Sequence, residues 1–335
     1  MPNLTAQKVW NLNHAELHAL LDSGELKPQS DTIHFYAPSF SYYKTKHFCS
    51  SNSEFPTVSV TGNSCALNCK HCGGKVLETM HPARTSTELF SLGMKLKENG
   101  AKGVLVSGGC LPDGSVPLGG FVEVLGRLKR ELGLTVFVHT GIIGAETAFL
   151  LKKAGVDAAL IDIVGSEETV QQIFNSKIGV RDYVGSLRAL TKADLNVVPH
   201  VIVGLNGGRL DGEFNALQIV AQNSTPKAVV IIAFMPILGT EMENTKPPKP
   251  IDIAKVVASA RLMFPQTPLV LGCMRPKGKL RSETDVLALK AGVDGIAFPS
   301  EEAIEKAQKT HKVAFSSFCC AQMYMDFGWC LDTCG

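Results

Sequence analysis

Short apolar stretches alternate with amphipathic ones along most of this 335-residue chain. The apolar stretches are apolar almost throughout, which is typical of parallel strands buried on both faces of a sheet. The segments between them repeat their apolar residues at the spacing of a helix, so each would cover the sheet along one side. We expect strands at 57–60, 103–107, 134–139, 158–163, 197–203, 228–235, 269–271 and 295–297, and helices at 15–21, 87–99, 120–132, 144–154, 184–193, 211–222, 251–262 and 284–291.

The tetrapeptide Ala-Gly-Val-Asp marks two of the returns from helix to strand. It occurs at 154–157 and at 291–294, each time with the glycine where the helix would end. Repeated β-α units of this size predict an α/β fold, a full or partial (β/α) barrel of the TIM type. We assign the barrel to residues 56–300, with an N-terminal extension at 1–55 and a cysteine-rich C-terminal extension at 301–335.

Composition limits the classes of partner. Charged residues make up 19% of the chain and the net charge is +2, so no basic excess favours nucleic acid or an anionic membrane. No apolar run is long enough to cross a bilayer, and the polar start has no signal-peptide core. We therefore expect a soluble cytoplasmic protein that binds neither nucleic acid nor membrane. Its ten cysteines would then bind metal rather than form disulfides.

Three of these cysteines form the motif that carries the chemistry. Cys65, Cys69 and Cys72 follow the first expected strand with the spacing C-x3-C-x2-C. Three thiolates this close can hold three irons of a cubane [4Fe–4S] cluster and leave the fourth iron open. A zinc site would need a second pair of cysteines or histidines close by, and none follows. The spacing therefore favours an iron–sulfur cluster at the carboxyl end of a barrel strand, where such folds place their chemistry.

This motif, in this position, resembles the radical S-adenosylmethionine (radical SAM) superfamily. The resemblance implies that the amino and carboxylate groups of SAM bind the open iron. One electron, from a donor such as ferredoxin or flavodoxin, then splits SAM into methionine and a 5′-deoxyadenosyl radical. It also implies that the backbone of Gly108 and Gly109, after the second strand, meets the amino group of SAM. The family often has Glu as the next residue, whereas this chain has Cys110.

Later strand ends supply further candidates for the SAM site. Asp162 could accept hydrogen bonds from the ribose hydroxyls, or could instead cap the following helix. His139 faces the same rim, and His200 either joins it or is a core histidine with a partner. Gly204 lies in a segment similar to one that packs against adenine in biotin-synthase-like proteins, and Pro236 could shape the wall of the pocket.

Seven cysteines lie outside the motif, and they suggest a second iron–sulfur cluster. We expect its ligands to be Cys273, Cys319 and Cys320, with a fourth from Cys49 or Cys110. Buried free cysteine is a common alternative for one or two of them. Arg275 could bind a substrate carboxylate or peptide backbone, although surface arginines are commoner. Cys330 and Cys334 could serve cluster delivery, zinc binding or no function.

Within the superfamily, the chain resembles biotin-synthase-related proteins, and among them the split, two-protein lipoyl synthases. The segments that carry this resemblance are 34–40, 60–62, 106–109 with 113–117, 199–200 with 204–205, and 271–276 with 319–320. It implies sulfur insertion into an octanoyl group on a lysine of a lipoyl domain or peptide. A second radical SAM lipoyl synthase component would insert the other sulfur. The alternatives are a one-cluster radical SAM enzyme that methylates or modifies a peptide, and a non-catalytic iron–sulfur scaffold.

Overall fold

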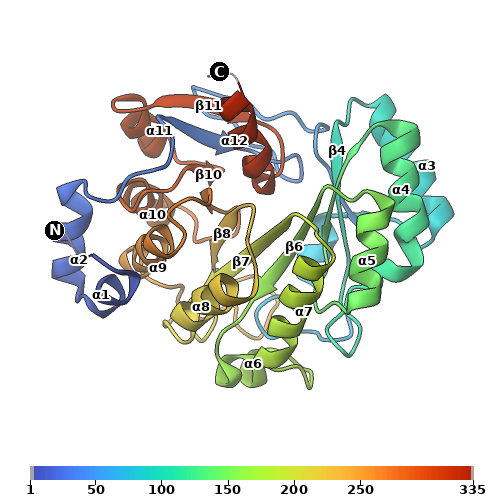
Figure 1. Ribbon diagram of the computed structural model, residues 1–335, viewed down its shortest axis with the longest axis horizontal. Coiled ribbons are helices and arrows are strands. Elements are labelled where there is room, and N and C mark those ends of the chain that lie inside the picture. The colour runs from blue at the N-terminus through green and yellow to red at the C-terminus, as the bar shows by residue number, and fades with distance from the viewer. Residues whose placement is uncertain (1–3, 333–335) are drawn as a thin grey trace.

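One parallel sheet of 11 strands, curled into a half-barrel, forms the centre of the molecule (Figure 1). The computed structural model describes residues 4–332, and it describes side chains as far as residue 327. The strand order is β11-β1-β10-β9-β8-β7-β6-β5-β4-β2-β3, and every pairing is parallel. The α/β fold class and the partial barrel are therefore confirmed. The strands are β1 (Thr32–Tyr36), β2 (Thr57–Ser59), β3 (His81–Pro82), β4 (Gly103–Ser107), β5 (Thr135–His139), β6 (Ala158–Ile163), β7 (Val197–Val203), β8 (Val229–Ala233), β9 (Leu269–Leu271), β10 (Gly295–Ala297) and β11 (Lys312–Ser316).

Each strand expected from the sequence is present, and β4, β6, β7, β9 and β10 have the expected bounds. Three strands are additional: β1, β3 and β11. Both outer segments of the chain therefore contribute to the sheet, because β1 pairs with β10 and with β11. β1 was not expected as a strand, because its partners β10 and β11 lie at the other end of the chain.

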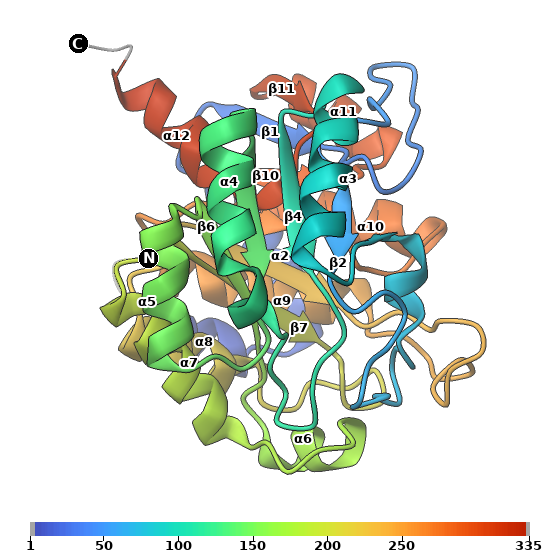
Figure 2. The ribbon, with the colours of Figure 1, turned by 90° about the vertical axis from the view of Figure 1, so that its right-hand side faces the viewer.

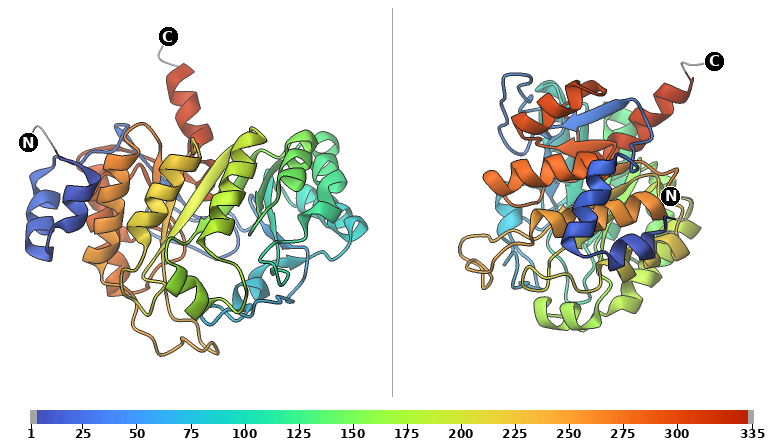
Figure 3. Two further views of the ribbon diagram at one scale, coloured as in Figure 1. Left: turned by 60° about the horizontal axis from the view of Figure 1, so that its bottom comes forward. Right: turned by 90° about the vertical axis from the view of Figure 1, so that its left-hand side faces the viewer.

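Helices cover the outside of the sheet. The pair α1 and α2 lies beyond α9, at one side of the molecule (Figure 3), and Lys255 of α9 bonds the carbonyl oxygen of Trp10 in α1 over 3.0 Å. None of the helices in the described part of the chain is long and apolar enough to span a bilayer. The helices are α1 (Ala6–Asn11), α2 (His14–Ser23), α3 (Ser86–Glu98), α4 (Val122–Leu132), α5 (Ala145–Ala154), α6 (Glu167–Ile173), α7 (Val180–Lys192), α8 (Glu213–Asn223), α9 (Pro250–Met263), α10 (Lys279–Lys290), α11 (Glu301–Gln308) and α12 (Met323–Asp332), with short 3-10 turns at Lys75–Thr79, Leu118–Phe121 and Cys320–Gln322.

The repeated Ala-Gly-Val-Asp segments form the same local structure. Gly155 and Gly292 end α5 and the turn after α10 with left-handed φ angles of 83° and 85°. The aspartates that follow then bind the neighbouring strand: Asp157 accepts the backbone N–H of Val136 over 2.8 Å, and Asp294 accepts that of Leu269 over 2.7 Å. Each repeat thus sets the register of a new strand against the previous one.

Apolar side chains form one layer between sheet and helices and a second inside the half-barrel. The inner layer includes Phe137, Leu160 and Val198, from β5, β6 and β7. Side chains two positions apart on a strand share a face. His139, Asp162 and His200 therefore point into the same interior, nearer the carboxyl ends of these strands.

The segment after β11 closes the amino-terminal end of the half-barrel. The ring of Phe318 lies 5.3 Å from that of Phe55, and the hydroxyl of Tyr324 donates to the carbonyl oxygen of Asp157 over 2.8 Å, at the start of β6. Figure 2 shows α12 at the opposite end of the barrel from α6, which follows the carboxyl end of β6. Cys319 and Cys320, between β11 and α12, are buried.

Candidate functional site

The three-cysteine loop follows β2 and is held by its own backbone and by α6. The backbone N–H groups of Cys72 and Gly73 both donate to the carbonyl oxygen of Cys69, over 3.1 and 2.7 Å. The N–H of Lys70 donates to the carbonyl oxygen of Ile173, the last residue of α6, over 3.0 Å. Gly73 and Gly74 have φ angles of 51° and 74°, which only glycine adopts without cost. The loop is therefore fixed in a tight turn that gathers its thiols.

Hydrogen bonds to sulfur favour the thiolate form of two of these cysteines. The pKa of Cys65 falls to about 5, first because the Cys110 thiol donates to it, and then through backbone N–H groups, while burial opposes the shift. The Cys69 thiol likewise lowers the pKa of Cys72, and its own pKa rises. Thiolates are the form that binds metal, so the loop is prepared for a metal cluster.

The two glycines after β4 allow that turn to touch the cysteine loop. A Cβ on Gly109 would lie 2.0 Å from the carbonyl oxygen of Ser64, so only glycine fits. The N–H of Gly109 donates to Oγ1 of Thr61 over 2.7 Å, and the N–H of Ala66 donates to the carbonyl oxygen of Cys110 over 2.8 Å. The close backbone approach expected of Gly108 and Gly109 is thus used, in this structure, to join the two loops.

Cys110 belongs to this first group of thiols. Its N–H donates to Sγ of Cys65 over 3.3 Å, and its pKa is raised first by the Cys65 thiol and then by burial, with a further contribution from Asp162. The structure therefore places Cys110 away from its expected role as a ligand of a second cluster. The reason is that β4 pairs directly with β2, so their carboxyl-terminal loops are neighbours.

The thiols are spread more widely than a single zinc ion would require. Among the described residues, one group of three or more His, Cys, Asp or Glu has all its ligand atoms within 4.8 Å of one another, and it contains no cysteine. Four thiolates around one zinc ion lie closer than this, since each Zn–S bond is about 2.3 Å. The spacing suits a multinuclear cluster better.

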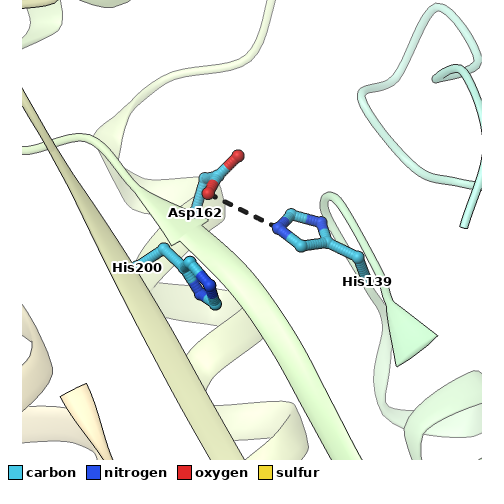
Figure 4. Close-up of side chains that lie close together, drawn as sticks. All are labelled: His139, Asp162 and His200. Atoms are coloured by element: carbon cyan, nitrogen blue, oxygen red, sulfur yellow. Dashed lines mark ion pairs between the residues drawn. The ribbon is translucent and has the colours of Figure 1, made fainter. Parts of the chain in front are cut away.

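That compact group consists of His139, Asp162 and His200 (Figure 4). They come from β5, β6 and β7, which are neighbours in the sheet, and Asp162 pairs in register with His200. Nε2 of His139 lies 3.4 Å from Oδ1 of Asp162, and the two imidazole rings are 5.6 Å apart between centroids. The structure thus brings together three residues that the sequence placed at one rim.

These side chains face the inside of the half-barrel. Those of His139 and Asp162 are 25% and 39% exposed, yet burial is the largest influence on the pKa of each. Burial lowers the pKa of His200 to about 4. For His139, burial is outweighed by the charge of Asp162 and its side-chain contact taken together, so the pKa of His139 is raised. For Asp162, the same two contributions from His139 help to lower the pKa in spite of burial.

The other two expected SAM contacts lie on the loops after β7 and β8. Gly204 has a φ of 73°, donates its N–H to Glu213 over 2.8 Å, and is covered by Pro248, whose ring would be 2.7 Å from a Cβ. Gly204 therefore serves the turn itself. Pro236 is partly exposed on the loop after β8, at the same end of the sheet.

Cys273, Cys319 and Cys320 come together inside the half-barrel. Cys319 and Cys320 belong to the inner apolar layer, and Cys273, just after β9, packs against it. Burial raises the pKa of Cys273 to about 11, with a further contribution from Cys319. Cys319 also interacts electrostatically with His139. These thiols therefore lie close to the group formed by His139, Asp162 and His200. The three thiols named from the sequence as cluster ligands are thus neighbours.

The remaining cysteines do not join them. Cys49 is exposed on the loop between β1 and β2, where its thiol contacts the carbonyl oxygen of Ser50 at 3.9 Å. The side chain of Cys330 and the whole of Cys334 lie outside the described residues. Neither Cys49 nor Cys110 is therefore placed as the fourth ligand of the interior group.

Arg275 has a structural position instead of the substrate-binding one expected. Its side chain is 0% exposed, and Nε lies 2.7 Å from Oδ1 of Asp285, which is also 0% exposed. The guanidinium also donates to the carbonyl oxygens of Gly272 and Phe298, over 2.7 and 3.2 Å. With its donors turned to protein acceptors, Arg275 joins the loops after β9 and β10.

Residues 59–211 match the family described as the radical SAM superfamily. This match covers the cysteine loop, the glycine turn after β4 and all three residues of the histidine group. The chain carries a radical SAM domain.

Curated proteins similar to this chain include biotin synthases. That of Francisella philomiragia subsp. philomiragia is 31% identical over 180 residues, which are 52% of this chain and 56% of the relative. That of Coxiella burnetii (strain RSA 493 / Nine Mile phase I) is 26% identical over 271 residues, 79% of this chain and 83% of the relative. The chain thus spans little more than half the length of the Francisella protein.

Solved structures support the fold. HydG, a maturase of the [FeFe]-hydrogenase, superposes with a TM-score of 0.62 at 19% identity, over 88% of this chain and 64% of that one. Methylornithine synthase (PylB) does so with a TM-score of 0.56 at 17% identity, over 88% and 81%. At these identities the likeness concerns the fold alone.

A radical SAM domain implies a [4Fe–4S] cluster and SAM, and the residues present fit both. Cys65, Cys69 and Cys72 are a thiol set in which the thiolates of Cys65 and Cys72 are stabilised, and Cys65 already accepts an N–H bond of the kind that cluster sulfurs receive. The electrostatic contact between Cys110 and Asp162 shows that the cysteine loop faces the interior where Asp162 lies. SAM could therefore span from the cluster to that carboxylate.

Two contacts of the radical SAM site were not expected from the sequence. Thr61 binds the glycine turn through Oγ1, and Cys110, which was expected at the second cluster, adds a fourth thiol here. A signal for Cys110 existed, because consecutive strands of a parallel barrel are usually neighbours. The role of Thr61 had none, since a threonine before a cysteine motif is ordinary.

Proposed function

We propose that this protein is a radical SAM enzyme that inserts sulfur into an unactivated C–H bond of an octanoyl group, carried on a lysine of a lipoyl domain or peptide, in lipoate biosynthesis. One observation carries the proposal: Cys273, Cys319 and Cys320 lie together in the barrel interior, below the strand ends of the SAM site. A thiol group in that place can hold an auxiliary iron–sulfur cluster close to a bound substrate.

In this proposal, each part of the site binds a different part of the cluster and SAM. Cys65, Cys69 and Cys72 hold the [4Fe–4S] cluster, the turn at Gly108 and Gly109 positions the amino group of SAM, and Asp162 receives the ribose. When bound, the cluster and SAM supply a 5′-deoxyadenosyl radical that abstracts hydrogen, and a second cluster would supply the sulfur. The apolar inner layer excludes water from the carbon radical.

His139, His200 and Pro236 would line the space between SAM and substrate. His200 itself is neutral, since its pKa is about 4. The similarity to biotin synthases supports sulfur insertion in general; the octanoyl substrate rests on the segments that resemble split lipoyl synthases. The partners implied are a lipoyl domain, a second radical SAM component and a cytoplasmic electron donor such as ferredoxin or flavodoxin.

The test is turnover of a synthetic peptide that carries octanoyl-lysine, under anaerobic conditions with SAM and a reductant. We expect 5′-deoxyadenosine together with a peptide whose mass has increased by one sulfur, and we expect neither when Cys65 is replaced by alanine. Deoxyadenosine without a sulfur-bearing peptide would overturn sulfur insertion at this substrate and leave a radical SAM enzyme of other chemistry. No deoxyadenosine from protein with a full cluster would favour the non-catalytic scaffold.

A count of iron and sulfide tests the second cluster separately. We compare the reconstituted wild type with a variant in which Cys65, Cys69 and Cys72 are all alanine. About four irons should remain in this variant and disappear when Cys273 and Cys319 are also replaced. If the triple variant holds no iron, the auxiliary cluster does not exist, and a one-cluster radical SAM enzyme for methylation or peptide modification takes its place. Cys49→Ala is the control, because that thiol is exposed on a separate loop.

A further inference from the structure

The group His139, Asp162 and His200 has the composition and geometry of a mononuclear metal site. One ligand atom from each lies within 4.8 Å of the others, and the three residues belong to adjacent strands of a rigid sheet. Figure 4 shows the carboxylate of Asp162 and the ring of His139 turned toward each other, with the ring of His200 beside them. Two imidazoles and one carboxylate are a ligand set that binds divalent transition metals.

The backbone already fixes His200 in the form that a metal needs. Nδ1 of His200 lies 3.1 Å from the carbonyl oxygen of Val198, which can only accept, so Nδ1 carries the proton. In a neutral imidazole this leaves the lone pair on Nε2. Histidines that bind metals are commonly oriented by such a bond from the other ring nitrogen to a carbonyl oxygen.

Asp162 supplies a buried oxygen that accepts no hydrogen bond. This Oδ1 forms an ion pair with Nε2 of His139 at 3.4 Å, a separation beyond good hydrogen-bond distance. Buried polar atoms are nearly always satisfied, so an oxygen held by a long ion pair and by no hydrogen bond can accept a further group such as an ion. It faces the two imidazoles.

We propose that His139, Asp162 and His200 bind one divalent transition-metal ion, separate from the thiol sites. Three protein ligands leave coordination positions open toward the interior, where part of a bound molecule could complete them. Asp162 would use Oδ1 for the metal and keep its other oxygen for the ribose contact proposed above. The inference stands whether or not the enzyme inserts sulfur.

Mn²⁺ is a suitable probe because it prefers oxygen and nitrogen ligands to thiolates. We would titrate Mn²⁺ into the anaerobically reconstituted protein, kept oxidised so that the cluster is silent in electron paramagnetic resonance (EPR), and follow the signal of free Mn²⁺. We expect one Mn²⁺ bound per chain, displaced by Zn²⁺, with ¹⁴N coupling from histidine in pulsed EPR of the bound ion. The nitrogen coupling needs no variant, so it holds even if a substitution impairs folding.

His200→Ala and Asp162→Asn should each weaken Mn²⁺ binding by about tenfold or more, the scale on which even outer-shell partners of metal sites act. The matched control is His14→Ala, which removes a His–Asp pair on the surface, where His14 Nε2 lies 2.8 Å from Oδ1 of Asp252 and no second histidine is present. This variant should bind Mn²⁺ like the wild type. Absence of histidine nitrogen coupling, or equal binding by wild type and both site variants, would overturn the proposal.

Discussion

The backbone N–H of Cys110 donates a hydrogen bond to Sγ of Cys65 over 3.3 Å. This contact joins the loop after β2 to the turn after β4, the two strands that lie side by side near one edge of the sheet. The contact depends on Gly109, which has no Cβ to hold the two loops apart. The residue that determines the geometry of the cysteine loop is thus not itself a ligand.

Gly109→Ala should therefore reduce cluster binding more than it reduces stability. The added Cβ would lie 2.0 Å from the carbonyl oxygen of Ser64 and 2.7 Å from Cα of Cys65, so the loops must separate and the bond to Cys65 is lost. We expect substantially less iron per chain after reconstitution. Gly120→Ala is the control, because nothing lies within 4 Å of its Cβ position. Equal iron content in the two variants would contradict this account.

The ion pair of Arg275 and Asp285 should matter for stability and not for substrate affinity. Both side chains are 0% exposed, so Arg275→Met leaves a buried carboxylate without its partner. Removal of one member of a buried pair costs about 3–5 kcal/mol. We expect a loss of this order in the free energy of unfolding measured in urea. Replacing both residues, as Arg275→Met with Asp285→Leu, should recover part of it.

A surface pair gives the comparison. Arg127 and Glu131 lie one helical turn apart on α4, with an Nε–Oε1 distance of 2.7 Å, and are 39% and 47% exposed. Arg127→Met should change the unfolding midpoint far less than Arg275→Met does, since solvent screens exposed pairs. If the two variants were equally stable, burial would not be the reason for the effect.

The hydroxyl of Tyr36 should hold the C-terminal segment under the barrel. It donates to Oδ2 of Asp326 over 2.5 Å and lies 3.2 Å from the sulfur of Met323. Tyr36→Phe removes the donor and should cost about 1.5–3 kcal/mol, the usual contribution of a hydrogen bond to a charged group. In protein without clusters, Cys319 and Cys320 should then react faster with a thiol reagent. Tyr43→Phe, whose hydroxyl binds the carbonyl oxygen of Pro299 at 2.7 Å, should not accelerate that reaction.

Sequence periodicity predicts the barrel well because each β-α unit carries its own signals. The strands β4 to β10 are apolar, and the returns at Gly155 and Gly292 need left-handed glycines. The strands β1 and β11 escaped prediction because they form only through pairing between distant segments. In an extended stretch without alternating polar and apolar residues, the local sequence does not indicate which distant strand it will pair with.

In the candidate site, too, the features set by local sequence were predictable, and those that depend on contacts between distant segments were not. Cys65, Cys69 and Cys72 are predictable from local spacing, and His139, Asp162 and His200 from the rule that strand ends share one rim. The burial of Arg275 was not predictable, because its carboxylate partner is supplied by α10 and its carbonyl acceptors by loops of different strands. The grouping of Cys319 with Cys273 was suggested by composition, but its place inside the barrel depends on how the C-terminal segment returns.

Stability should fall between mildly acidic and neutral pH because of Glu213. This side chain is 3% exposed and accepts the N–H groups of Gly204 and Asp211 over 2.8 and 2.6 Å, and burial raises its pKa to about 7. Unfolded, the group titrates near pH 4.3. Between these values the folded chain holds the extra proton, so the free energy of unfolding decreases as pH rises, by up to about 4 kcal/mol in total.

Urea unfolding at pH 4.5 and pH 8 measures this dependence. Glu213→Gln cannot titrate, so its loss of stability between the two values should be smaller than that of the wild type. Glu131→Gln is the control, since Glu131 is exposed and the bonds from Arg127 lower its pKa instead of raising it. The carboxyl of Glu213 accepts the N–H of Gly204, in the turn that directly follows β7 and His200, so its ionisation acts close to the site. Parallel pH profiles for wild type and Glu213→Gln would mean that Glu213 is ionised in the fold and that the backbone donors outweigh its burial.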